Sequence, residues 1–465
     1  MTQEEIKALY FIGCGGIGMS ALVRYFLSKG KFVGGYDLTP TPLTKQLEEE
    51  GALIHYEDNV DQIPLCCKDK AHTLIVYTPA IPSSHTELSY FRMNEFEIQK
   101  RSEVLGSITR SSQGLCVAGT HGKTTTSSML AHLLTQSPVG CNAFLGGILK
   151  NYDSNLLLSK ESNLTVIEAD EFDRSFHHLS PRMSIITSAD PDHLDIYGTP
   201  EAYRESFEHF TSLIHPGGTL LMRRGIDIVP RLQAGVQLKT YGTDALCDYY
   251  AENILVGNGE IHFDFVSPTM RIDHISLGVP LRINVENAVA AITIALLNGV
   301  SPADIKQGIS SYRGAKRRFD FHLKTERIVL IDDYAHHPQE LKASILSVKE
   351  LYVGRRICGI FQPHLYSRTK DFAVEFAESL SALDELVLLD IYPAREKPIP
   401  GVSSQMILDK VSLENKVCCC KEGLLEEMKK RDCEVVLMVG AGDIENLISP
   451  LKKQLEEKYV LTDKE

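Results

Sequence analysis

The segment that most constrains the fold of this 465-residue chain is residues 115–126, LCVAGTHGKTTT. A short apolar run, typical of a buried strand, leads into a glycine loop, and the pattern that follows, SSMLAHLL, is helical. A strand, a glycine loop and a helix start in this order form a phosphate-binding site, because backbone N–H groups and the helix dipole both favour negative charge. We therefore predict that a nucleotide phosphate chain contacts Gly119, Thr120, His121, Gly122, Lys123, Thr124 and Thr125.

Two side chains in this segment have predicted roles of their own. Lys123 is expected to reach the outer phosphates, and the Thr124 hydroxyl is expected to ligate Mg²⁺. The usual P-loop pattern has a further glycine at the position that Val117 occupies here, so the loop is a shortened variant. The alternative is an ordinary glycine-containing turn between a strand and a helix.

A second glycine motif, GCGGIG, follows the predicted strand at residues 8–12. It satisfies G-x-G-x-x-G, and an acid, Asp37, ends the next predicted strand, as in a dinucleotide-binding fingerprint. Taken alone, this motif favours a nicotinamide-dependent oxidoreductase, although it requires only a diphosphate at a helix start. The residues predicted to contact that ligand are Gly13, Gly15, Gly16, Ile17, Gly18 and Asp37.

Polar side chains follow two further strands of the central region. Glu168 follows a strand at 164–167 and His193 follows one at 183–188, so both are expected at the carboxyl edge of a parallel sheet. A carboxylate there suits Mg²⁺ opposite the phosphate loop. The alternatives are a solvated acidic loop for residues 168–173 and a structural role for the histidine. Asn287, near the start of an alanine-rich helix, is expected either to contact a base or to cap that helix.

The last third of the chain has four predicted strands, at 328–331, 357–361, 386–389 and 435–439, with helices between them. This alternation predicts another βαβ domain. Because polar residues gather after the strands, we expect an active-site rim there. Between the central and last regions, residues 248–281 alternate polar and apolar residues and are expected to form a small antiparallel sheet.

Composition limits the classes of function. A formal net charge of −13 argues against nucleic-acid binding. No apolar stretch approaches the roughly 20 residues that span a bilayer, and the start, MTQEEI, is acidic, so we expect neither membrane insertion nor a secretory signal. Eleven cysteines form no C-x-x-C pair. Buried free thiols in a reducing cytoplasm are the simplest interpretation.

Ten motifs in order resemble the Mur ligases, the ATP-dependent amide ligases of peptidoglycan precursor synthesis. They are GCGGIGMS, GTHGKTTT, VIEADEFD, DPDHLDIYG, NVENA, AKRRFDFH, DDYAHHP, FQPHLYSRT, IYPAREKPIPG and GAGDI, and they span nearly the whole chain. Within the family, the pattern is similar to the branch that adds L-alanine to the lactyl carboxylate of UDP-N-acetylmuramate. The shortened G-x-x-GKTT loop is a mark of this family.

The resemblance implies an α/β fold of three domains, with expected bounds 1–111, 112–314 and 315–465. These would be a Rossmann-like UDP-sugar-binding domain, a P-loop-type ATPase domain and a Rossmann-like domain that closes over the site. It also implies ATP, L-alanine and two Mg²⁺ ions as ligands, with Thr124, Glu168 and His193 holding metal. Arg318, Asp333 and Tyr334, with Asn287, match ATP contacts, and Lys123, His193, His337 and Arg368 match catalytic positions.

Two positions depart from family patterns. Phe207 stands where many related ligases carry a carbamylated lysine, which agrees with the alanine-adding branch, and Leu365 stands where many alanine-adding enzymes have arginine. The alternatives are a recycling ligase that attaches a tripeptide to the same sugar, an NAD(P)-dependent oxidoreductase, and a P-loop switch or motor. Either His193 or His337 is expected to deprotonate the amine of the amino acid.

Overall fold

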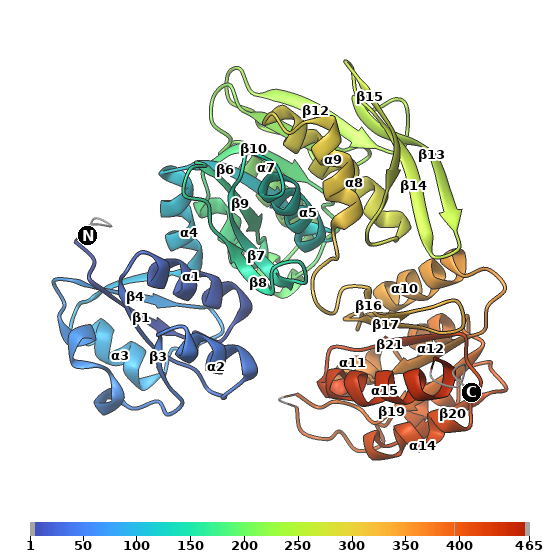
Figure 1. Ribbon diagram of the computed structural model, residues 1–465. Helices are drawn as coiled ribbons and strands as arrows, with labels where there is room; N and C mark the ends of the chain where they lie inside the picture. The colour runs from blue at the N-terminus through green and yellow to red at the C-terminus, as the bar shows by residue number, and fades with distance from the viewer. Residues whose placement is uncertain (1–4, 395, 461–465) are drawn as a thin grey trace. The chain divides into compact units, whose positions relative to one another are not determined.

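The computed structural model describes residues 5–394 and 396–460; the first four residues, Arg395 and the last five lie outside the described part. The described residues form three sheets, labelled in Figure 1. They also divide into two compact units. The first comprises residues up to Glu252 with Asp264–Ile275 and Val285–Tyr312, and the second comprises Asn253–Phe263, Ser276–Asn284 and the residues from Arg313 onward.

The first sheet is parallel, with strand order β3-β2-β1-β4-β5. The order changes direction between β1 and β4, and in open α/β sheets ligands bind outside the carboxyl ends of the strands at such a point. Helices α1 and α2 pack on the face of Leu9 and Phe11, and α3 packs on the face of Tyr10. The elements are β1 (Ala8–Ile12), α1 (Ile17–Ser28), β2 (Phe32–Tyr36), α2 (Pro42–Glu49), β3 (Leu53–His55), β4 (Thr73–Tyr77), α3 (Thr86–Met93) and β5 (Glu97–Lys100).

The end of this region differs from the sequence pattern. The local pattern of residues 89–98, SYFRMNEFEI, favours a helix throughout, yet α3 ends at Met93 and β5 begins at Glu97. Pairing of β5 with β4 supplies backbone hydrogen-bond partners that the local pattern does not reveal. The residues just before the expected boundary at 111 form a helix, α4 (Arg101–Arg110).

The second sheet has ten strands in the order β15-β14-β13-β12-β11-β10-β6-β9-β7-β8. Strands form within 248–281, as expected, but they do not make a sheet of their own, because β13 pairs in parallel with β12 and so extends the central sheet. Its strands are β6 (Gln113–Ala118), β7 (Asn142–Leu149), β8 (Ser154–Leu157), β9 (Leu164–Ala169), β10 (Pro181–Ile186), β11 (Thr219–Arg223), β12 (Gln237–Gly242), β13 (Tyr249–Gly257), β14 (Glu260–Val266) and β15 (Arg271–Ser276).

Helix α5 begins directly after the phosphate loop and is held to α9 by buried polar contacts. The Ser128 and Tyr312 hydroxyls lie 2.6 Å apart, and His132 Nε2 lies 3.0 Å from Ser311 Oγ. The helices of this region are α5 (Lys123–Thr135), α6 (Leu194–Tyr197), α7 (Pro200–Thr211), α8 (Arg282–Leu297) and α9 (Pro302–Ser311), with a 3₁₀ segment at Phe172–His178.

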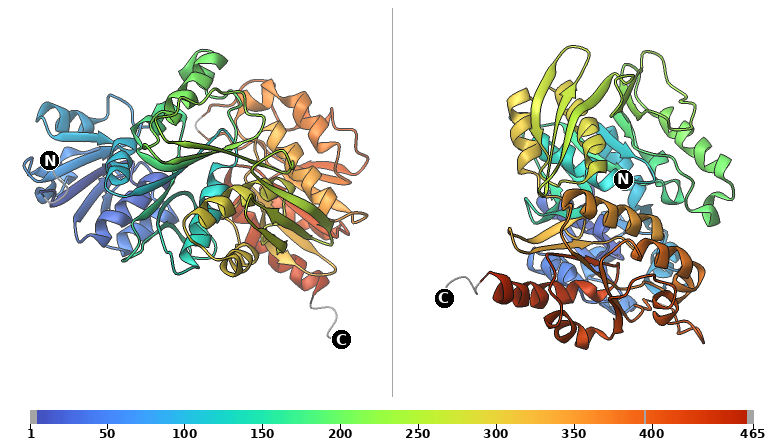
Figure 2. Two further views of the ribbon diagram at one scale, coloured as in Figure 1. Left: turned by 90° about the horizontal axis from the view of Figure 1, so that it is seen from above. Right: turned by 90° about the vertical axis from the view of Figure 1, so that its right-hand side faces the viewer.

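The third sheet has the order β16-β17-β21-β18-β19-β20, parallel except for β16, and its four predicted strands are confirmed. Helices α14 and α15 pack on one face, and α12 packs on the other through Phe376 against Phe361 (Figure 2). The strands are β16 (Asp320–Lys324), β17 (Val329–Asp333), β18 (Ile357–Phe361), β19 (Glu385–Leu389), β20 (Lys416–Cys419) and β21 (Val435–Val439). The helices are α10 (Pro338–Leu351), α11 (Tyr366–Asp371), α12 (Ala373–Leu380), α13 (Gln405–Leu408), α14 (Leu424–Lys429) and α15 (Ile448–Tyr459).

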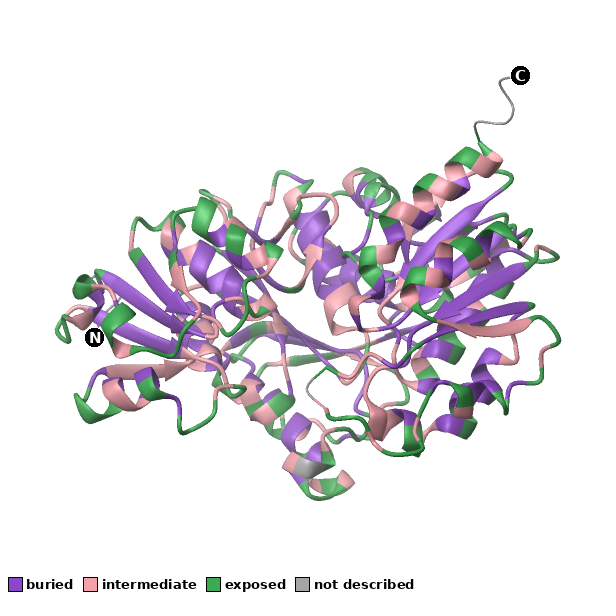
Figure 3. Cartoon of the chain, turned by 90° about the horizontal axis from the view of Figure 1, so that it is seen from below, coloured by how far each residue is buried: buried purple, intermediate pink, exposed green. Residues whose placement is uncertain are grey.

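Central strands of all three sheets are buried along their length, whereas the helices show exposed residues on their outer faces (Figure 3). Burial on both faces explains why these strands are continuous apolar runs in the sequence. None of the helices among the described residues has the length and apolarity that crossing a bilayer requires.

Phe207 tests the packing of the central region. Its ring is fully buried, with ring centroids 5.1 Å from Phe176 and 5.2 Å from Tyr203. We expect Phe207→Ala to lower the free energy of unfolding by about 3–5 kcal/mol, because it removes buried apolar area and leaves a cavity. Phe32→Ala, at a ring that is 39% exposed, is the control and should cost less than about 1 kcal/mol. Chemical denaturation measures both; equal losses would contradict the packing described here.

Candidate active site

The loop between β6 and α5 requires glycine at two positions. Gly119 and Gly122 have φ of 142° and 82°, values that residues other than glycine rarely adopt. A Cβ at Gly119 would lie 2.0 Å from Thr187 Oγ1, and one at Gly122 would lie 2.9 Å from Asn287 Oδ1. The backbone of the loop is therefore packed tightly against its neighbours.

Residues after β10 hold this loop in place. The Thr187 hydroxyl lies within hydrogen-bond distance of two carbonyl oxygens, Ala118 O at 3.1 Å and His121 O at 2.5 Å. The N–H of His121 donates to Ser188 Oγ at 2.8 Å. Gly122 caps α5 without any side-chain hydrogen bond. The first-turn N–H groups of α5 thus receive no side-chain cap, an arrangement that favours a bound anion.

Lys123 forms an ion pair in which both side chains are largely buried. Its Nζ lies 2.7 Å from Glu171 Oε2, with side-chain exposures of 14% and 3%, and it donates to Gly119 O at 2.6 Å. Burial raises the pKa of Glu171, and the charge of Lys123 opposes that rise. The sequence singled out Lys123 but not Glu171, which lay among several acids. The pair keeps the cation at the loop, where a phosphate would compete with Glu171 for it.

Glu168 lies next to the loop because β9 pairs with β6 and places it opposite Val117. Its Oε1 accepts a hydrogen bond from Thr124 Oγ1 at 3.0 Å, and its Oε2 accepts one from Gly146 N at 3.1 Å. Burial raises its pKa, while the nearby Lys123 lowers it. A carboxylate beside a hydroxyl is an oxygen-only donor set of the kind that Mg²⁺ prefers, completed by water and phosphate oxygens. The residues present therefore fit this ion.

His193 also follows its strand, as expected, and is the residue before α6 with φ of 52°. Its ring packs edge-on against Phe172, with centroids 5.1 Å apart, and its Nε2 lies 3.8 Å from Asp192 Oδ2. Among the described side chains, no cluster of three or more His, Cys, Asp or Glu ligands contains either Glu168 or His193. The metal role of His193 stays a prediction.

Asn287 does not cap a helix, so that interpretation is wrong: α8 begins at Arg282, a full turn earlier. The side chain is buried, and its Oδ1 accepts a hydrogen bond from Thr126 Oγ1 at 3.1 Å. The same oxygen lies against Gly122. Asn287 is thus part of the packing around the phosphate loop, and a contact with ATP stays a prediction.

Asp37, the acid directly after β2, contacts the first glycine loop. Gly15 N donates to Asp37 Oδ2 at 2.7 Å, and a Cβ at Gly15 would lie 2.6 Å from Thr44 Cγ2. Gly13 has φ of 86°, and Gly16 N donates weakly back to its carbonyl at 3.5 Å. One oxygen of Asp37 therefore orders the loop, and contacts of the loop residues with a ligand stay predictions.

Arg101 is a residue that the sequence reasoning missed. A Cβ at Gly18 would lie 2.0 Å from Arg101 Nη1, while Arg101 Nη2 donates to Asp170 Oδ2 at 2.9 Å. The neighbouring Lys100 pairs with Asp173 at 2.7 Å. The start of α4 thus connects the first glycine loop to the acidic segment after β9. The only sequence signal is a basic pair, Lys100-Arg101, ahead of Glu103.

Polar residues also gather at the carboxyl edge of the third sheet. Asp333, at the end of β17, accepts a hydrogen bond from Phe319 N at 3.3 Å, and burial raises its pKa. The ring of Tyr334 is faced by two guanidinium groups, Arg317 at 5.2 Å and Arg318 at 5.7 Å. Arg317, absent from the sequence-based set, also pairs with the fully buried Asp332 at 3.3 Å. Burial raises the pKa of Asp332 to about 7.

His337 and Arg368 belong to the same edge. His337 immediately precedes α10, and its ring packs edge-on against Phe372 with centroids 5.0 Å apart. Arg368 lies in α11, and its buried Nη1 has no hydrogen-bond partner among the described residues. A buried, unpartnered N–H on a guanidinium suits an anionic ligand. Leu365, just before α11, has φ of 70°, a strained value for leucine.

Comparison with known proteins agrees with this architecture. Three family models match in succession: "Mur ligase family, catalytic domain" over residues 8–113, "Mur ligase middle domain" over 117–295 and "Mur ligase, glutamate ligase domain" over 317–444. The chain is 66% identical to a UDP-N-acetylmuramate–L-alanine ligase of Parabacteroides distasonis, covering 98% of both chains. It is 47% identical to the ligase of that name from Flavobacterium psychrophilum, covering 98% of this chain and 100% of that one.

Solved structures show the same fold. The UDP-N-acetylmuramate–alanine ligase of Thermotoga maritima superposes with a TM-score of 0.80 at 28% identity, covering 97% of this chain and 99% of that one. A murein peptide ligase of Psychrobacter arcticus superposes with a TM-score of 0.66 at 20% identity, covering 97% and 98%. From the matched models, the near full-length relatives and the shared three-domain α/β fold, we conclude that this chain belongs to the Mur ligase family.

Proposed function

We propose that this chain joins L-alanine to the lactyl carboxylate of UDP-N-acetylmuramate in peptidoglycan precursor synthesis, using ATP and Mg²⁺. The observation that carries the proposal is the pairing of the two functional side chains of the loop, Lys123 with Glu171 and Thr124 with Glu168. One pair keeps a cation ready for phosphate, and the other forms an oxygen-only metal site. The high identity to UDP-N-acetylmuramate–L-alanine ligases supports this choice of substrates.

The first half of the reaction is governed by charge. The lactyl carboxylate must attack the γ-phosphorus of ATP, which gives an acyl phosphate and releases ADP, and the two approaching anions repel each other. Mg²⁺ supplies neutralising charge when bound, and Lys123 adds a cation that moves from Glu171 to the phosphate. Glu168 and Thr124 would hold one ion. We propose a second ion, with His193 among its ligands, since the triphosphate and the incoming carboxylate together carry more negative charge than one divalent ion neutralises.

The second half joins the amine to the activated carboxyl group. The neutral amine of L-alanine attacks the acyl phosphate, and a tetrahedral intermediate collapses to the amide and phosphate. A base must take the ammonium proton, and His193 and His337 are the candidates. Arg368, with its buried unpartnered N–H, suits the departing phosphate or the amino-acid carboxylate.

We assign the remaining residues by domain. Residues 1–111 would bind the UDP-sugar through Gly13, Gly15, Gly16, Ile17, Gly18 and Asp37. Residues 112–314 would bind ATP, with Asn287 beside the loop, and residues 315–465 would contribute Arg318, Asp333 and Tyr334. We also place the reaction in the cytoplasm, where ATP is available and where the eleven reduced cysteines would persist.

The choice of amino acid is tested by phosphate release with UDP-N-acetylmuramate across a panel of acceptors. We expect L-alanine to stimulate ATP turnover, and the L-alanine–D-glutamate–diaminopimelate tripeptide not to do so. The reverse preference would identify a recycling ligase. Turnover that no amino acid stimulates would contradict the proposal as a whole.

Replacement of Lys123 tests its role on phosphate. Lys123→Ala should lower the rate of ligation at least about 10²-fold, because a preorganised cation is lost where charge develops. Binding of UDP-N-acetylmuramate, measured by calorimetry, should stay within about twofold.

Lys123→Ala also leaves Glu171 buried without its cation, which could lower stability. The double variant Lys123→Ala/Glu171→Gln removes that charge, so it should recover stability but not activity. Lys160→Ala, at an exposed lysine, is the control. ATP-dependent ligation retained in either Lys123 variant would contradict the mechanism.

Glu168→Gln tests the metal site. The Mg²⁺ concentration needed for half-maximal rate should rise about tenfold or more, because the anionic ligand is lost. In the natural protein this requirement should rise as pH falls, since burial raises the pKa of Glu168 and protons then compete with Mg²⁺. The glutamine variant should show a flatter pH dependence. Glu161→Gln, at an exposed position, is the control, and an unchanged requirement in Glu168→Gln would remove Glu168 from the site.

A further inference from the structure

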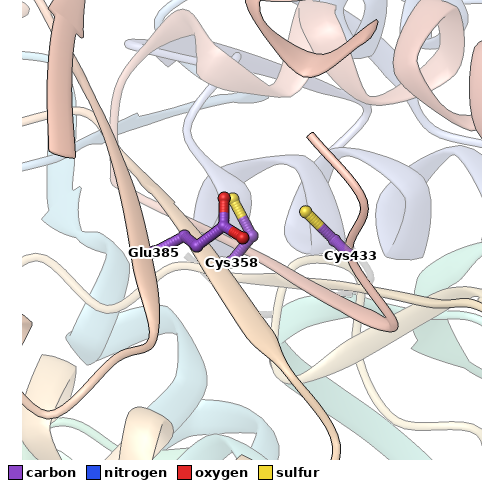
Figure 4. A group of neighbouring side chains, drawn as sticks. All are labelled: Cys358, Glu385 and Cys433. Atoms are coloured by element: carbon purple, nitrogen blue, oxygen red, sulfur yellow. The ribbon is translucent and has the colours of Figure 1, made fainter. Parts of the chain in front are cut away.

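Two cysteines and a glutamate lie close together in the third sheet, at the end where its parallel strands begin. Cys358 in β18 lies directly opposite Glu385 in β19, and Cys433 lies two residues before β21, the other neighbour of β18. Their exposures are 0%, 6% and 2%. Figure 4 shows the two thiols and the carboxylate pointing toward one another. The strands carry Asp333 at their opposite ends, so within the third sheet the cluster is separate from Asp333 and Tyr334.

The distances are close to those of a metal site. One ligand atom from each of the three residues lies within 4.8 Å of the other two. Around a tetrahedral Zn²⁺, with Zn–S of about 2.3 Å and Zn–O of about 2.1 Å, ligand atoms lie roughly 3.5–3.8 Å apart. The three groups therefore need to approach one another by about 1.3 Å at most, within the reach of side-chain adjustment.

We propose that Cys358, Cys433 and Glu385 form a site for a thiophilic divalent cation, with Zn²⁺ as the type. The ion would take two sulfur ligands and one oxygen ligand, and water could complete a tetrahedron. Thiolates favour Zn²⁺ over Mg²⁺, so this site would not compete for the ion that serves ATP.

Arg431 supports the carboxylate in the way that outer partners support metal ligands. Its Nη1 donates to Glu385 Oε2 at 2.8 Å, and its Nη2 donates to Glu427 Oε1 at 3.0 Å. The other oxygen of Glu385 has Arg356 Nη1 at 3.7 Å, which is beyond hydrogen-bond distance. Arg431 thus orients one carboxylate oxygen, and the other accepts no hydrogen bond from Arg356. A hydrogen-bonded ligating carboxylate is usual in metal sites.

Charge balance also permits a cation beside Arg431. Without metal, Glu385 and Glu427 offset Arg431 and Arg356. On binding, each thiol releases its proton to solvent, and the two thiolates offset the two charges of Zn²⁺. The buried site is then neutral with and without the ion, so binding leaves no uncompensated charge in the interior.

The sequence could not reveal this site, because its cysteines are distant in the chain and form no C-x-x-C pair. Ordinary buried cysteines provide the contrast. Cys141 is 2% exposed, and its Sγ has Thr135 Oγ1 at 3.5 Å and Ala131 O at 3.6 Å. No metal-ligating cluster among the described residues contains it. Cys141 is therefore the matched control.

The test is titration of the full-length, reduced protein with Co²⁺, a spectroscopic substitute for Zn²⁺. We expect sulfur-to-cobalt charge-transfer absorption that saturates at one ion per chain and is displaced by Zn²⁺. Cys358→Ser and Cys433→Ser should each lose most of that absorption, and Glu385→Gln should weaken binding at least about tenfold. Cys141→Ser should behave like the natural protein. The magnesium-dependent ligation assay tests the proposed function and not this cation site, so the two proposals can fail separately.

The cobalt titration would overturn the proposal if it gave no charge-transfer absorption, absorption retained in both serine variants, or loss of the same size in Cys141→Ser. If the serine variants unfold, ¹¹³Cd nuclear magnetic resonance of the natural protein decides instead. A resonance shifted by two sulfur ligands is expected, and a signal from oxygen ligands alone would contradict the site. The proposal would also be contradicted if Cys358 and Cys433 formed a disulfide in the oxidised protein and the reduced protein showed no metal affinity.

Discussion

Parallel pairing of β6 with β9 and β10 is the constraint on which the central site depends. It brings Glu168 opposite Val117 and Ile185 opposite the same residue on the other side, so three strands end together. The glycine loop, the acids after β9 and the Thr187–Ser188 segment then meet without long connections. A slip of one residue in the register of β9 would turn Glu168 to the opposite face of the sheet, away from Thr124, and so remove the proposed metal site.

Much of this arrangement could be predicted from the sequence. The strands β1, β2, β6 and β18 arise from mainly apolar runs, and glycines or polar residues mark their ends. The sequence therefore predicts both these strands and the carboxyl edge at which the candidate site residues lie. Local signals of this kind identified Lys123, Thr124 and Glu168. They failed where pairing decides structure: β5 and the β13–β15 extension form because neighbouring strands offer hydrogen-bond partners.

The residues that escaped prediction act through partners distant in the chain. In the sequence Glu171 is one acid among several, and only the fold shows that it pairs with Lys123. Nothing in the local sequence shows that Arg101 lies between Gly18 and Asp170. Cys358 and Cys433 likewise become neighbours only because β18 lies beside β21. No spacing rule relates such pairs, since their proximity is a property of sheet order and not of sequence distance.

Buried charge also determines how the loop between β6 and α5 is held by its neighbours. Glu168 and Glu171 lie where burial raises their pKa, a cost that would favour their protonation if they stood alone. The Lys123 cation offsets part of that cost, and Thr124 Oγ1 and Gly146 N donate to Glu168. If a phosphate binds Lys123 and displaces Glu171, the buried carboxylate of Glu171 loses the cation that pairs with it. Exchange of partners thus links nucleotide binding to uptake of a positive charge, because neither anion is stable in the interior without one.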